Sequence, residues 1–255
     1  MCHSTLWSKH LKQQGQFVSN AILVASLESQ PSQIVIDSRE YLVVTANTVG
    51  NDGFEVVLRA PATQEGPANH LRNKKANDLI LICGELSLFS KGDSGWKENH
   101  ELDGKPIIRV SACCDATEQQ FFNEVTLVGR FVGETKEAEK SCSRSVVVNR
   151  YKQKEQISDF FRIRGYKSST PGRSSWGERI AKAPKGTLVE VNGMMTTEKS
   201  KDGSTYPVIK VRRMRVHKTG SGGSKADPAK EKAASGYEHS QFVADDDDQM
   251  PSSNW

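Results

Sequence analysis

The sequence lacks several features that mark common classes of protein. It has five cysteines among 255 residues, and an odd number at scattered positions does not form a disulfide framework. Cys113 and Cys114 are adjacent, with neither a Cys-x-x-Cys spacing nor a neighbouring pair of histidines, which argues against a zinc site. We therefore expect a reduced, intracellular protein that holds no metal and uses no cofactor.

Long apolar runs are also missing. No stretch approaches the roughly 18 apolar residues of a membrane span, and the first twenty residues lack the apolar core of a secretory signal. Hydrophobic residues make up 36% of the chain, which is enough for ordinary cores but too little to pack the whole chain. We expect a cytoplasmic protein without a membrane partner, and the length favours two domains.

Catalytic motifs are the third absence. The sequence has no motif of paired carboxylates, no metal-ligand spacing, no glycine-rich phosphate loop and no nucleophile elbow. Its six histidines are scattered, and only His217 lies within residues 119–218. These absences predict a protein that is not an enzyme.

Charge is present but unevenly distributed. The net charge of +4 divides into +2 for residues 1–17, −5 for 18–118, +11 for 119–218 and −4 for 219–255. A strongly basic segment of domain size is typical of proteins that bind polyanions, and the alternative is a merely basic surface.

Three matched segments indicate an internal repeat. Residues 20–27, 78–84 and 104–110 resemble residues 123–130, 187–193 and 205–211, at offsets of 103, 109 and 101. The matches occur in the same order at nearly one offset, which predicts two copies of one domain.

The pattern within each copy predicts short strands. In the second copy we expect strands at 123–132, 143–151, 158–167, 187–199 and 205–217, with a hairpin at Asp202-Gly203. Trp176 and Ile180 lie four residues apart and predict a helix at 176–183. Five strands with a helix between the third and fourth predict an all-β protein of two tandem OB-folds, and the helix disfavours an SH3-like barrel.

The domain boundaries follow from composition. We predict a disordered extension at 1–17, a first, acidic OB-fold at 18–118 that serves assembly or weak binding, and a second, basic OB-fold at 119–218. Residues 219–255 are rich in Gly and Ser and then acidic, which predicts a disordered linker and tip.

The third strand of the second copy carries the main candidate site. Alternation places Phe160, Arg162, Arg164 and Tyr166 on one face. Aromatic rings interleaved with arginines form a platform for unstacked bases and phosphates. The alternative is a sheet face covered by a partner domain. The equivalent strand of the first copy, residues 53–59, has one aromatic, one acid and one base, and we expect it to lack the platform.

Other residues extend this candidate site. The further candidates are Arg130, Arg150, Tyr151, Lys152, Lys167, Arg173 and Arg212. Strict alternation does not allow Arg212, Arg213 and Arg215 to share one face.

The C-terminal segment combines an acidic run with apolar residues. A charge run is usually a solvating tail, but an apolar terminus adds an anchor for a basic, apolar-lined pocket. We predict a docking peptide made of Asp245, Asp246, Asp247, Asp248, Met250, Pro251 and Trp255.

These motifs together resemble the bacterial single-stranded DNA-binding protein family. The resemblance is carried by residues 123–130, 148–151, 159–162 and 185–193, by the Gly-rich linker and by the acidic tip. It covers about a hundred residues of the second copy and the tail. The motifs are moderately specific one by one, and their order is more so.

The resemblance implies a function. It implies sequence-independent binding and protection of single-stranded DNA in replication, recombination and repair, at the nucleoid, with Phe160, Tyr166 and Tyr151 stacking on bases. The family's fourth stacking position falls near Ser200, where no aromatic stands. Family tips usually end in Pro-Phe and recruit replication and repair proteins, whereas this chain ends in Ser-Ser-Asn-Trp255. Two OB-folds in one chain imply a homodimer. The alternative is an RNA-binding or primosome-type accessory protein.

Overall fold

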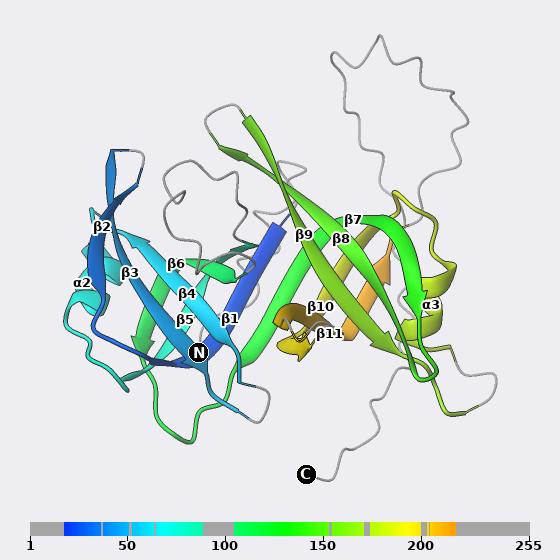
Figure 1. Ribbon diagram of the computed structural model, residues 1–255, viewed down its shortest axis with the longest axis horizontal. Helices are drawn as coiled ribbons and strands as arrows, with labels where there is room; N and C mark the ends of the chain where they lie inside the picture. Colours follow the sequence, from blue (N-terminus) through cyan, green and yellow to red (C-terminus); the bar gives the residue numbers. More distant parts are fainter. Residues whose placement is uncertain are drawn as a thin grey trace. The chain divides into compact units, whose positions relative to one another are not determined.

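The computed structural model describes residues 18–36, 38–50, 53–63, 65–88, 105–152, 155–170, 174–199, 203 and 205–217. Within these ranges the chain forms eleven strands and two short helices (Figure 1). Neither of these helices is long and apolar enough to cross a bilayer.

Apart from one extra strand in the first copy, the two copies have the same order of elements. The first contains β1 (Val18–Leu27), β2 (Ser32–Ile36), β3 (Arg39–Thr48), β4 (Glu55–Pro61), α2 (Glu65–Arg72), β5 (Leu79–Leu88) and β6 (Pro106–Asp115). The second contains β7 (Asn123–Glu137), β8 (Ser141–Lys152), β9 (Glu155–Tyr166), α3 (Trp176–Lys182), β10 (Leu188–Lys199) and β11 (Thr205–Val216). The predicted all-β fold of two OB-folds is confirmed. The first copy has one strand more than predicted, because β2 forms a hairpin with β3.

Strand pairing shows how closely the copies agree. β4 pairs parallel with β6, and β9 pairs parallel with β11. β5 and β10 each meet their antiparallel partner with a bulge, at Cys83/Gly84 and at Asn192/Gly193. At both bulges a glycine is required by close approach. A Cβ on Gly84 would lie 2.2 Å from the Arg109 carbonyl oxygen, and one on Gly193 would lie 2.2 Å from that of Lys210.

The pairing also corrects one of the predicted offsets. Ala21 pairs with Gly84, and Val125 pairs with Gly193, so β1 and β7 correspond at an offset of 104 rather than 103. A shift of one residue reverses the face of every side chain in a strand, and only the observed offset aligns buried Leu23 with buried Leu127.

The copies are joined through their first strands. β1 and β7 lie side by side (Figure 1) and pair antiparallel from Val18↔Val128 to Leu23↔Asn123. On its other edge β7 pairs with β10, and the Asn123 side chain extends that pairing, because its amide donates to the Met195 carbonyl at 2.8 Å and its amide oxygen accepts from the Met195 N–H at 3.0 Å. One sheet therefore runs through both barrels.

Inward-facing residues of the strands fill the barrels. Leu23 and Ile82 of the first copy and Leu127 and Ile163 of the second have no exposed surface. α3 closes one end of the second barrel with Ile180, also fully buried, and with Trp176 against the core, as the sequence predicts. The helix begins after Ser175, whose Oγ accepts from the Glu178 N–H.

Candidate nucleic-acid interface

The outer face of β9 carries the four residues that alternation selected. Phe160 is 57% exposed and Tyr166 is 51% exposed, with half-buried Arg162 and Arg164 between them. The intervening residues, Phe161, Ile163 and Gly165, are buried in the barrel. We call the face formed by Phe160, Arg162, Arg164 and Tyr166 the platform.

Small side chains on β8 leave the platform open on one side. Register places Val147 opposite Phe160, Ser145 opposite Arg162 and Ser143 opposite Arg164. None of these three side chains is large enough to cover an aromatic ring. The two rings are six residues apart along β9, a span of about 20 Å for an extended strand.

On the other side of β9, a tyrosine of β11 supports the platform. The guanidinium of Arg162 lies over the ring of Tyr206, 4.5 Å from its centroid. Such a contact holds an arginine in place while its edge can still reach a phosphate.

Arg164 has an acidic partner. Its Nη2 lies 2.7 Å from Oε2 of Glu198 on β10, and the Tyr206 hydroxyl donates to the same oxygen at 3.4 Å. The two platform arginines are thus tied by different contacts to one pair of residues, Tyr206 and Glu198.

Three other residues of the predicted site contact partners within the protein. Nε of Arg150 lies 2.6 Å from Oδ2 of Asp159. Asp159 is only 4% exposed, and its Oδ1 also accepts from the Leu88 N–H of the first copy at 3.4 Å. Arg130 donates to the Gly186 carbonyl at 2.9 Å, and Lys167 pairs with Glu137 at 3.2 Å. The structure therefore does not bring Arg150 to the platform.

A bulge changes the expected placement of the arginines in β11. Asn192 pairs with Arg213 and Gly193 with Val211, so Arg212 is the extra residue. Arg212, Arg213 and Arg215 are all exposed, and Nη2 of Arg212 reaches the Met194 sulfur at 3.6 Å. Strict alternation was wrong here, because the inserted residue resets the side-chain order.

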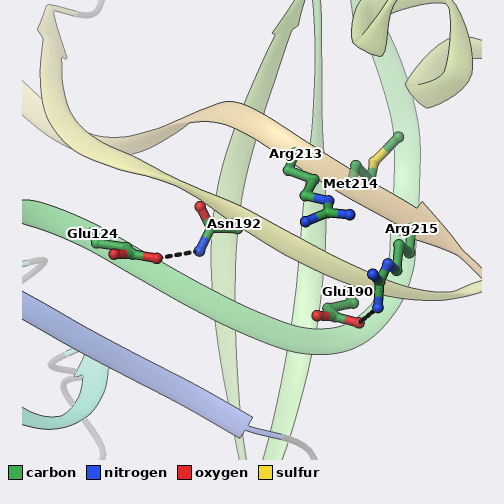
Figure 2. Close-up of a pocket in the computed structure, with 6 residues that line it drawn as sticks. All are labelled: Glu124, Glu190, Asn192, Arg213, Met214 and Arg215. Carbon is green, nitrogen blue, oxygen red and sulfur yellow. Dashed lines mark hydrogen bonds and ion pairs between the residues drawn. The ribbon is translucent and has the colours of Figure 1, made fainter. Parts of the chain in front are cut away.

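Arg213 and Arg215 line a pocket on the outer side of β10 and β11, and this pocket contains both acidic and basic side chains. Figure 2 shows Arg213 and Arg215 beside Glu190, Asn192 and Glu124. Oε2 of Glu190 lies 3.8 Å from Nη1 of Arg215, and the Asn192 side-chain amide donates to Oε1 of Glu124 at 2.7 Å. The acids oppose the arginines, and the residues that line this pocket include no aromatic ring on which a base could stack.

Several predicted residues lie outside the described part of the chain. They are Arg173, the side chains of Tyr151 and Lys152, and the tail residues Asp245, Asp246, Asp247, Asp248, Met250, Pro251 and Trp255.

The equivalent face of the first copy differs in chemistry. The parallel pairs Leu58↔Ile108 and Ile163↔Ile209 align Glu55 with Phe160 and Val57 with Arg162. Val57 is fully buried in an apolar cluster with Ile36 of β2 and Ile107 of β6. The hairpin arm β2 therefore contributes to closing the face that stays open in the second copy.

The groups with shifted pKa values lie off the platform. Burial raises the pKa of the Cys113 thiol to about 11, so this thiol is protonated and a poor nucleophile at neutral pH. Burial lowers the pKa of Arg144, whose guanidinium donates to the Gly133 and Ala183 carbonyls and lies over the Phe131 ring. Arg144 is a structural arginine of the barrel.

Solved structures with the same architecture exist. The wild-type single-stranded DNA-binding protein from Thermus aquaticus matches 84% of this chain and 99% of its own, with a TM-score of 0.58 and 12% identity. The fold is that of a two-OB-fold single-stranded DNA-binding protein. A deletion mutant of the Thermus protein matches 86% of this chain and 100% of its own, with a TM-score of 0.56 and 12% identity. Neither protein-family models nor curated proteins give a match to the sequence.

Sequence reasoning missed Tyr206 and Glu198. Both residues could have been found from the topology of the OB-fold, in which the third strand of the barrel pairs parallel with the fifth. That neighbour relation places the outer side of β11 beside the platform.

Proposed function

We propose that this protein binds single-stranded DNA without sequence preference, on the platform of its second copy. The observation that carries the proposal is the pair of half-exposed rings, Phe160 and Tyr166, flanking two arginines on one strand face. Stacking on such rings does not depend on base identity, because every base has a π-face. The net charge of +11 in residues 119–218 supports a polyanionic ligand.

The similar Thermus protein supports this proposal through its fold. That protein is a single-stranded DNA-binding protein, and nearly its whole length matches this chain. We further propose that binding serves replication, recombination and repair at the nucleoid, that the acidic tip recruits partner proteins and that the chain forms a homodimer. Sedimentation of the full chain tests the homodimer.

The ligand is tested by fluorescence titration with oligo-dT, oligo-rU and duplex DNA at several salt concentrations. We expect a strong preference for oligo-dT, with log K falling against log salt at about −0.7 per phosphate neutralised. Comparable weak binding to all three would reduce the platform to a general polyanion patch, and a preference for oligo-rU would favour an RNA ligand.

The stacking role is tested by substituting both rings. Phe160→Ala with Tyr166→Ala should cost roughly 2–6 kcal/mol of binding free energy if both rings stack on bases. Phe121→Ala is the matched control, because Phe121 is 50% exposed and precedes β7 rather than lying on the platform. Unchanged affinity of the folded double variant for oligo-dT would contradict the stacking role of the two rings.

A further inference from the structure

Glu198 lies where a negatively charged ligand would be expected. It is in β10, and its carboxylate reaches past β11 to Arg164 on β9, with 2.7 Å between Oε2 and Nη2. The Tyr206 hydroxyl, 3.4 Å away, donates to the same oxygen. Within the described ranges, this is the acid that contacts a platform arginine.

Two buried polar atoms, one in the ion pair and one on β10, have no hydrogen-bond partner among the described residues. Arginine presents its nitrogens as a fork that matches two oxygens of a carboxylate or phosphate. Here Glu198 engages Nη2, whereas Nε of Arg164 is buried with no hydrogen-bond partner among the described residues. Thr196 Oγ1, two residues before Glu198 on β10, is buried and unpartnered in the same sense. An unmet buried donor makes the present pairing easier to exchange.

We propose that Glu198 holds the position of a DNA phosphate on Arg164 in the unliganded protein, and that a bound strand displaces it. This inference rests on the proposed function. A phosphate offers more than one oxygen to the arginine fork, so the exchange can satisfy Nε as well as Nη2. Glu198 is then an internal competitor that lowers affinity for single strands.

The first test removes the competing charge. In the full chain, Glu198→Gln should bind oligo-dT about two- to fivefold more tightly, the range expected from releasing a partly exposed ion pair. Glu190→Gln is the matched control. It removes one negative charge from the same strand, but its partner is Arg215, away from the platform. A general charge effect predicts equal gains for both variants.

A second variant separates charge from contact and guards against misfolding. Glu198→Asp keeps the charge but shortens the side chain by one methylene, so we expect a smaller gain than for Glu198→Gln. Thermal unfolding confirms that each variant is folded before its affinity is compared.

The double variant with Arg164 decides the mechanism. Arg164→Met should weaken binding and reduce the salt slope by about 0.7. In that background Glu198→Gln should gain no more than Glu190→Gln does. Equal gains in the native background, or a Glu198→Gln gain that survives Arg164→Met, would overturn the inference while leaving the proposed function intact. Failure of the unsubstituted chain to bind oligo-dT would refute both.

Discussion

At the scale of single residues, glycine at the bulges is dictated by backbone approach. A Cβ on Gly193 would lie 2.2 Å from the Lys210 carbonyl oxygen, which a rigid strand pair cannot relieve cheaply. We expect Gly193→Ala to lower the free energy of unfolding by about 1–3 kcal/mol, measured by urea denaturation.

Gly66 provides the control for this substitution. It lies in α2, and an added Cβ there would have nothing within 4 Å. Alanine also has a higher helix propensity than glycine. Gly66→Ala should therefore leave the free energy of unfolding unchanged or raise it by up to about 1 kcal/mol. Equal losses at both positions would contradict the close-approach argument.

Individual site residues were predictable where one strand decides the outcome. Phe160 and Tyr166 were placed correctly because alternation within β9 needs no information from other strands. Glu198 required knowing that β11 lies between β9 and β10. The ion pair of Arg150 was not foreseen, because its buried partner, Asp159, is nine residues away on another strand.

At the scale of elements, the two copies differ most in the face of their third strand. Arg162 lies over Tyr206 on the open face of β9, whereas Arg59 lies over Tyr41 beside the apolar cluster of β4. We expect Arg162→Met to weaken binding to oligo-dT and to reduce the salt slope by about 0.7.

Arg59→Met is the comparison within the same chain. It removes an equivalent charge and a similar ring contact, so its effect isolates the contribution of the first copy. We expect no change in affinity or salt slope, measured by the same titration. A loss equal to that of Arg162→Met would assign single-strand binding to both copies.

The positions of strands and helices along the chain were predicted more accurately than the register between paired strands. The five strands and the helix of the second copy were found at their predicted places, with β7 continuing to Glu137 rather than ending at residue 132. The offset between β1 and β7 was wrong by one residue, and the bulge at Arg212 was not foreseen. Apolar spacing marks a strand, but register depends on the partner strand, which the sequence of one strand does not contain.

At the scale of the whole molecule, charge is divided between segments of opposite sign. Residues 119–218 carry +11, and residues 219–255 carry −4. A tethered acidic segment competes with phosphate for the same basic surface. Deleting residues 245–255 should therefore leave affinity for oligo-dT unchanged or slightly higher, most visibly at low salt.

A deletion of equal length controls for this effect. Residues 234–244 contain one acid, compared with four in residues 245–255. Removing them should change affinity less than removing the tip. Weaker binding after deletion of the tip would contradict its assigned role and indicate that the tip contributes to the DNA site.

The β1–β7 pairing has a consequence for how the chain is made. Ribosomes add about 5–20 residues per second, so roughly 5–20 s separate the synthesis of Leu23 from that of its partner Asn123. During this interval the backbone of residues 18–23 has no strand on that side, and an unpaired edge readily accepts a strand from another chain. Neighbouring nascent chains on one messenger RNA offer such strands at high local concentration. Slow translation between the two copies should therefore increase misassembly between chains, and rapid synthesis should favour pairing within one chain.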